Sequence, residues 1–136
     1  MRKLSVNTFL TLDGVMQAPG GPEEDPSDGF AYGGWSHPYW DEHMNQVMAD
    51  VMGEPFDLVL GRKTYDIFAA FWPAAPEEAG GKPLNDATKY VASRGLPTLS
   101  WQHSVLIAGD AGDGVAEIKA GDGLSLIHIS EPTRPY

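Results

Sequence analysis

The segment from Asp57 to Phe68 constrains the fold more than any other part of the chain. An apolar run over residues 58–60 stops at Gly61 and Arg62, and a helical pattern starts at once. Its apolar residues recur at i, i+3, i+4 and i+7, which is one helix face: Tyr65, Phe68, Ala69 and Trp72. A buried strand that feeds directly into a helix leaves unpaired N–H groups at the helix start, and these favour an anion.

This junction therefore predicts a phosphate site. Gly61 lets a ligand approach the backbone, Arg62 adds a forked positive charge, and Thr64 adds a hydroxyl. The alternative is that Arg62 is a solvated residue at the helix start or the partner in an ion pair. Because a cation is mildly unfavourable at a helix N-terminus unless an anion is present, we favour the phosphate interpretation.

Composition limits the classes of protein that this chain fits. Its 136 residues favour one domain, and its content of 42% hydrophobic and 21% charged residues is typical of a soluble globular protein. The net charge of −10 argues against a nucleic-acid partner. No cysteine is present, and no apolar run approaches the roughly 18 residues that span a bilayer. We expect a cytoplasmic protein with neither a nucleic-acid nor a membrane partner.

The first third of the chain combines a strand, a long loop and a helix. Alternation over residues 3–12 predicts a strand, and Phe9 on its second face favours an inner strand with both faces covered. Residues 17–38 are rich in Pro, Gly and acids, and they predict a long loop that is either functional or poorly ordered. A helix with an apolar face packed in the core is predicted next, from Trp40, Met44, Val47, Met48 and Val51.

Strands and helices alternate in the remainder of the chain. Residues 73–84 predict a loop, and Lys89–Ser93 and Ser104–Ile107 predict short strands. A helical piece is expected at about 113–120. This alternation predicts an α/β domain with a mainly parallel sheet.

The C-terminal segment departs from that pattern. Residues 124–136 closely resemble the peptide obtained when sequencing-adapter DNA is read through as coding sequence. We therefore expect a gene fragment that is cut short near Gly123, with a non-native tail. A native terminal strand over Leu124–Ile129, which the alternation permits, is the alternative.

Four short motifs, in order and spacing, resemble the dihydrofolate reductase-like superfamily over residues 3–123. The closest resemblance is to a small bacterial branch related to the C-terminal reductase domain of riboflavin-biosynthesis deaminase/reductase proteins. The motifs are Leu10–Gly14, Leu60–Tyr65, Lys89–Ser93 and Trp101–Ser104. The resemblance implies a three-layer α/β/α domain over residues 1–123, with a central, mostly parallel sheet that is incomplete at the C-terminus.

The same resemblance implies an NADPH-dependent oxidoreductase that transfers hydride to a pterin- or pyrimidine-like ring. The model reaction is that of 5-amino-6-(5-phosphoribosylamino)uracil reductase. The implied partner is a small heterocyclic substrate, and a homodimer is compatible with the sequence. Two other interpretations stay open, namely a non-catalytic nucleotide-binding module of the same fold and an inactive gene fragment.

The resemblance also implies seven cofactor-binding residues in three groups. These are Asp13 and Gly14 in a flexible loop beside the nicotinamide, Gly61, Arg62 and Thr64 at the phosphates, and Ser93 and Arg94 near the adenosine ribose and its 2′-phosphate. A 2′-phosphate explains why both cations are arginine, since a guanidinium binds phosphate in a bidentate manner.

Two features of the superfamily have no clear counterpart in this chain. The second glycine-rich turn, which contacts the cofactor diphosphate, is missing before the chain ends. Folate-reducing members carry a carboxylate on the first helix, but the residues around Asp41 and Glu42 do not match, so no catalytic acid is assigned. His37 and His43 flank these acids without the His-Glu-x-x-His spacing, and no metal is expected.

Overall fold

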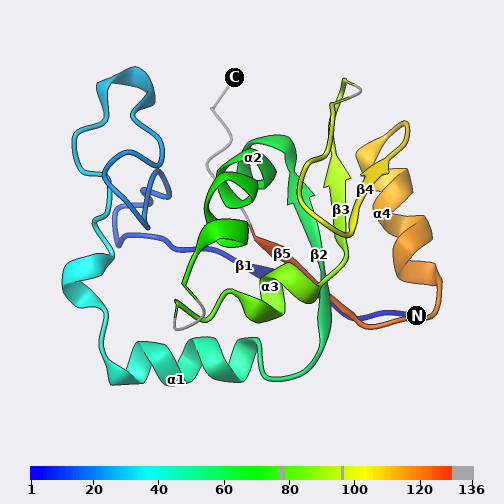
Figure 1. The fold of residues 1–136 in the computed structure, drawn as a ribbon, viewed down its shortest axis with the longest axis horizontal. Coiled ribbons are helices and arrows are strands. Elements are labelled where there is room, and N and C mark those ends of the chain that lie inside the picture. The colour runs from blue at the N-terminus through cyan, green and yellow to red at the C-terminus, as the bar shows by residue number, and fades with distance from the viewer. Residues whose placement is uncertain (77–78, 96, 130–136) are drawn as a thin grey trace. The chain divides into compact units, whose positions relative to one another are not determined.

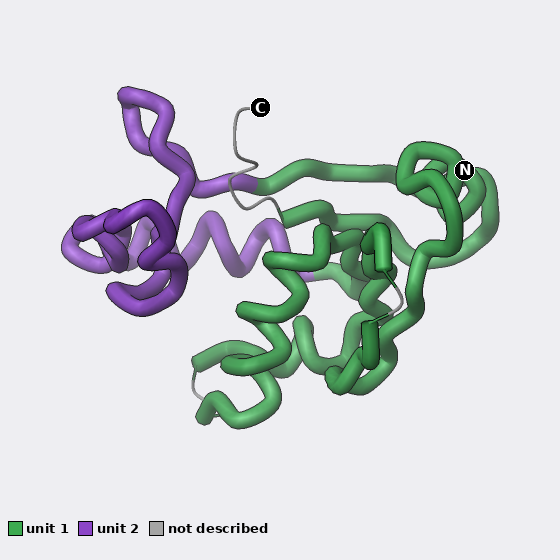
Figure 2. The backbone as a smooth tube through the Cα atoms, turned by 90° about the horizontal axis from the view of Figure 1, so that it is seen from above, with its two compact units in different colours: residues 1–7, 54–130 green, residues 8–53, 131–136 purple. Residues whose placement is uncertain are grey.

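The computed structural model describes residues 1–76, 79–95 and 97–129, which fall into two compact units (Figure 2). Unit 1 comprises residues 1–7 and 54–129 within this range, and unit 2 comprises residues 8–53. Each unit is described by itself.

Unit 1 is built on one five-stranded parallel sheet. Its strands, in spatial order, are β1 (Leu4–Asn7), β5 (Ser125–Ile129), β2 (Phe56–Gly61), β3 (Lys89–Ala92) and β4 (Ser104–Ile107). All four pairings between neighbouring strands are parallel. The structure therefore confirms the predicted α/β class.

Helices cover the two faces of this sheet. Figure 1 shows α2 (Arg62–Phe71) and α3 (Lys82–Asp86) on one side and α4 (Ala111–Ala120) on the other. Along β2, Leu58 and Leu60 are fully buried, whereas Val59 lies on the opposite face and packs with α4. Since side chains alternate between the faces of a strand, a β2 buried throughout needs cover on both sides. The result is the three-layer arrangement that the resemblance implies.

Two further contacts join β1 to the rest of unit 1. The Arg2 guanidinium forms a buried ion pair with the Asp57 carboxylate, and its Nε donates to the Leu124 carbonyl oxygen over 2.6 Å. The same guanidinium lies 5.7 Å from the centroid of the Tyr90 ring. One side chain thereby links β1, β2, β3 and the segment that leads into β5.

Unit 2 contains a long loop held by its own hydrogen bonds, followed by one helix. Gln17 donates to the carbonyl oxygens of Asp25 and Ser27, over 3.0 Å in each case, and its own carbonyl accepts from the Trp35 indole. The loop includes two short 3-10 helices, η1 (Ser27–Gly29) and η2 (His37–Tyr39), and α1 (Glu42–Val51) follows. The predicted loop over residues 17–38 is thus present and internally bonded.

The first strand is shorter than predicted, and it is not an inner strand. β1 ends at Asn7, which is the last residue paired with β5, and Val6 is 63% exposed. Phe9 lies beyond the strand and stacks on Trp40 within unit 2, with the ring centroids 6.0 Å apart. The alternation continues past the point where the neighbouring strand stops, so pattern alone overestimated the length of the strand.

Two predictions about helices also need correction. The apolar face of α1 is not a core face, because α1 has no buried residue and Val47 remains 41% exposed. Helical spacing predicts amphipathicity, but burial also requires a partner surface. Within the predicted loop over residues 73–84, the structure has the 3-10 helix η3 (Trp72–Ala74) and the start of α3. Helices this short have no periodic signal.

The segment after Gly123 contributes a central strand of the sheet. β5 lies between β1 and β2, and Leu126 is fully buried. Its secondary structure agrees with the strand alternative for Leu124–Ile129, while residues 130–136 lie outside the described residues. A non-native origin of this segment stays a prediction, which resequencing of the locus tests.

We expect Leu126→Ala to lower the free energy of unfolding by about 2–5 kcal/mol, because it removes buried methyl groups that pack with Val59 and Ile107. The measurement is urea unfolding followed by circular dichroism. Leu124→Ala is the matched control, since Leu124 is 45% exposed. That control should change stability by about 0.5 kcal/mol or less. Equal unfolding midpoints for Leu126→Ala and the wild type would contradict a central position for β5.

Candidate functional site

The carboxyl ends of the parallel strands bring two of the predicted groups of site residues to one edge of the sheet. Gly61, the last residue of β2, pairs with Ala92, the last residue of β3. Arg62 and Ser93 therefore follow neighbouring strand ends. In open α/β sheets, ligands bind outside the carboxyl ends of the strands. This edge of unit 1 is the candidate site.

Gly61 leads into α2 without a side chain that caps the helix. Its φ of −70° and ψ of 158° are accessible to any residue, and as the N-cap residue it makes no side-chain hydrogen bond to the first turn. The N–H groups there carry partial positive charge that attracts anions. A Cβ built at Gly61 would meet nothing within 4 Å, so the space beside it is open. Both observations are compatible with a phosphate at this turn.

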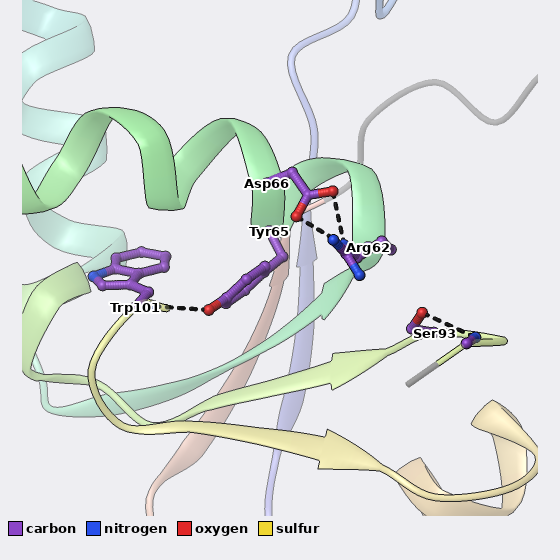
Figure 3. Close-up of polar contacts among 6 residues, drawn as sticks. Arg62, Tyr65, Asp66, Ser93 and Trp101 are labelled. Atoms are coloured by element: carbon purple, nitrogen blue, oxygen red, sulfur yellow. Dashed lines mark hydrogen bonds and ion pairs between the residues drawn. The ribbon is translucent and has the colours of Figure 1, made fainter. Parts of the chain in front are cut away.

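Arg62 is held by an ion pair with Asp66, one turn further along α2 (Figure 3). Its Nε donates to Oδ1 and to Oδ2 of Asp66, over 2.7 Å in each case. The two side chains are 43% and 51% exposed. The ion-pair alternative considered for Arg62 is thus observed. Within the described residues, no hydrogen bond engages its Nη1 or Nη2, so a phosphate role for these atoms stays a prediction.

Thr64 is buried in the first turn of α2. It is the third residue of α2, and only 3% of it is exposed. A residue buried to this degree offers little surface to a ligand, and a phosphate role for its hydroxyl stays a prediction. The backbone N–H of Thr64, by contrast, belongs to the uncapped first turn. If Thr64 contributes to the site, the N–H is the better candidate donor.

Ser93 and Arg94 form the turn that follows β3. The Ser93 Oγ accepts a hydrogen bond from the Gly95 N–H over 3.3 Å, and the side chain is half-buried. Arg94 is exposed. The turn therefore places an exposed arginine two residues after Ala92, which pairs with Gly61 at the carboxyl end of β2. Contact of either residue with an adenosine ribose or a 2′-phosphate stays a prediction.

Asp13 and Gly14 belong to unit 2, where they form a tight turn. The Gly14 N–H donates to the Thr11 carbonyl oxygen over 3.0 Å, and its φ of 89° favours glycine. The Thr11 hydroxyl donates to the Asp13 carboxylate over 2.6 Å, and this bond, followed by Asp13's own backbone N–H, lowers the pKa of Asp13. A role for this turn beside a nicotinamide stays a prediction.

Tyr65, in the first turn of α2, contacts the segment that precedes β4. It is 1% exposed and belongs to the core of unit 1. Its hydroxyl oxygen accepts the Trp101 backbone N–H over 2.9 Å (Figure 3) and lies 3.2 Å from the Ser104 Oγ. Tyr65 thus ties the start of α2 to the segment before β4. The Trp101–Ser104 motif was recognised in the sequence, but its hydrogen bonds to Tyr65 could not be predicted from it.

Lys89 is a buried cation that was not assigned a role from the sequence. Its side chain is fully buried, and its Nζ donates to the carbonyl oxygens of Asn85 and Gln102 over 2.6 and 3.2 Å. The Nζ also lies 4.2 Å from the centroid of the Trp101 ring. Burial lowers the pKa of Lys89 to about 8, while the negative charge of Asp86 acts in the opposite direction.

The described part of the chain contains neither a metal-binding cluster nor a membrane-spanning helix. Among its residues, no three His, Asp or Glu side chains gather where they could hold a metal ion. No helix in this part is long and apolar enough to cross a bilayer.

Comparison with known proteins gives a match to one family. The family model described as the RibD C-terminal domain matches residues 2–117, which is more than half of the chain. No curated protein matches the chain closely enough to count as a relative.

The burial of Lys89 leads to a test of pH dependence. Its pKa is about 8 in the folded chain, against about 10.4 for an unfolded lysine. Between these values the unfolded chain binds more protons, so the free energy of unfolding should rise with pH, by up to about 3 kcal/mol.

The measurement is urea unfolding between pH 7 and pH 10 for the wild type, Lys89→Met and the control Lys119→Met. The rise should be missing from Lys89→Met and retained in Lys119→Met, because Lys119 is only half-buried. Parallel pH profiles for the wild type and Lys89→Met would show that Lys89 titrates normally.

Proposed function

The chain belongs to the RibD C-terminal domain family, and on this premise we propose that it is an NADPH-dependent reductase that transfers hydride to a pterin- or pyrimidine-like ring. The family is a reductase domain of the riboflavin-biosynthesis type, which suggests a nicotinamide cofactor. The choice of NADPH and the class of substrate are the parts that we propose.

One arrangement carries the proposal. The uncapped start of α2, with Gly61 and Arg62, lies next to the turn with Ser93 and Arg94 because β2 and β3 pair in register. Two arginines and a row of backbone N–H groups therefore follow neighbouring strand ends at one edge of the sheet. A dinucleotide with an additional 2′-phosphate presents several phosphate groups, which is the complementary charge pattern.

The residues at this edge bind and orient rather than react. The cofactor supplies the hydride in a reduction of this kind, and the protein supplies binding, orientation and electrostatics. The uncapped N–H groups and Arg62 would hold phosphate oxygens, and Arg94 would add a second positive charge from the next strand. None of these groups needs to transfer a proton.

No side chain in the described part is assigned as a catalytic acid. Asp41, one of two carboxylates near the expected place, is the N-cap of α1 and accepts the Met44 N–H over 2.9 Å. Its carboxylate is therefore used to cap a helix. This observation supports leaving the proton donor to the substrate or to solvent.

Arg62→Ala should weaken NADPH binding by about 1.5–3 kcal/mol, which is the contribution of a charge-assisted hydrogen bond. Quenching of tryptophan fluorescence by NADPH measures the affinity, and NADH serves as the comparison ligand. We expect tighter binding of NADPH than of NADH. Lys119→Ala, which removes the same charge from the end of α4, should bind NADPH as the wild type does.

Two outcomes would revise the proposal. If wild-type protein gives no saturable signal up to millimolar NADPH, the cofactor assignment is wrong. If the protein binds NADPH but oxidises it with no pterin, flavin precursor or quinone, the chain is a nucleotide-binding module of the same fold.

A further inference from the structure

The ion pair between Arg62 and Asp66 is defined in geometry, although it contributes little to stability. Exposed pairs at i and i+4 on a helix are weak because water screens them. Here both oxygens of the Asp66 carboxylate lie 2.7 Å from the same atom, Nε of Arg62. Such a contact contributes little to the free energy of folding. It does, however, restrict the orientation of the Arg62 guanidinium.

The guanidinium is a rigid planar group with five N–H donors in a fixed fork. Asp66 uses the Nε edge, and four donors on Nη1 and Nη2 are left without a hydrogen bond among the described residues. Figure 3 shows the Asp66 carboxylate on one side of the guanidinium and Ser93 at the end of the neighbouring strand. Because the group is planar, a partner on one edge restricts the direction of the other.

We propose that Asp66 is a positioning residue for Arg62, holding the guanidinium by its Nε edge so that its Nη edge is available to a phosphate group at the start of α2. The proposal rests on the proposed function, because it concerns the same phosphate site. An arginine that is already ordered loses less side-chain entropy when the ligand binds, so the bound form is favoured.

A positioning role and a purely electrostatic role of Asp66 predict opposite changes in the affinity for an anionic ligand when the carboxylate is removed. Asp66 carries a negative charge one helical turn from the expected phosphate, and like charges repel. If charge alone mattered, removing the carboxylate would tighten the binding of an anionic ligand. If Asp66 orients Arg62, removing it releases the guanidinium and weakens binding. The sign of the change in affinity therefore separates the two roles.

The experiment measures the dissociation constant for NADPH, by tryptophan fluorescence, in the wild type, Asp66→Asn and Asp66→Glu. Asp66→Asn keeps the size of the side chain and removes its charge. It should weaken binding by about three- to tenfold, as expected when one long side chain must be ordered by the ligand. Asp66→Glu retains a carboxylate and should recover most of the affinity.

Asp86→Asn is the matched control. Asp86 accepts an exposed i, i+4 ion pair from Lys82 on α3, so the substitution removes the same charge from the same kind of contact. It should leave the affinity for NADPH unchanged. Circular dichroism and urea unfolding should show no loss of fold in Asp66→Asn, because a structural role would change stability rather than affinity.

A double-mutant cycle completes the test. In an Arg62→Ala background, Asp66→Asn should no longer weaken binding, since Asp66 acts through Arg62. Tighter or unchanged binding by Asp66→Asn alone, or equal weakening in both backgrounds, overturns the positioning role.

The cycle also separates the two proposals. If Arg62→Ala weakens binding and Asp66→Asn does not, only the positioning role fails. If wild-type protein does not bind NADPH at all, the proposed function and the positioning role fail together.

Discussion

Parallel hydrogen bonding on both sides of β2 is the interaction on which the rest of unit 1 depends. β2 pairs with β5 over Phe56–Leu60 and with β3 over Leu58–Gly61. Since both neighbours run in the same direction, the chain leaves these strands at one edge of the sheet. The helix start after Gly61 and the turn after β3 meet there for that reason. A change in register would move every side chain of β2 to the opposite face and separate the two turns.

The charged groups of unit 1 divide into a buried set and an exposed set. Arg2 is paired with Asp57, and Lys89 donates to backbone carbonyls, so each buried cation has polar partners that offset the loss of hydration. Arg62 and Arg94 lie at the surface. The buried set joins strands and helices, whereas the exposed set remains accessible to an anion. The same residue types thus serve the fold and the candidate site, and burial separates the two roles.

Elements with a local sequence pattern were predicted, whereas features that depend on distant parts of the chain were not. The strand and helix on either side of Gly61 were recognised because an apolar run and a helical face are local patterns. The first strand was overestimated, since its end is set by the last residue of β5 that pairs with it. α3 was missed because five residues are too few to show a period. Asp13 and Gly14 were expected in a flexible loop, and the structure forms a tight turn there.

By itself, the sequence determined the strand–helix junction and the family, because each is a short-range pattern of residue types, while the three groups of site residues stay a prediction. Only the tertiary structure decided that Thr64 is buried, that Lys89 lies against Trp101, and that residues 125–129 form a strand inside the sheet. It also showed that Arg62 is held by Asp66. The physical reason is that burial, register and ion pairing depend on which side chains become neighbours, and most of these neighbours are distant in the chain.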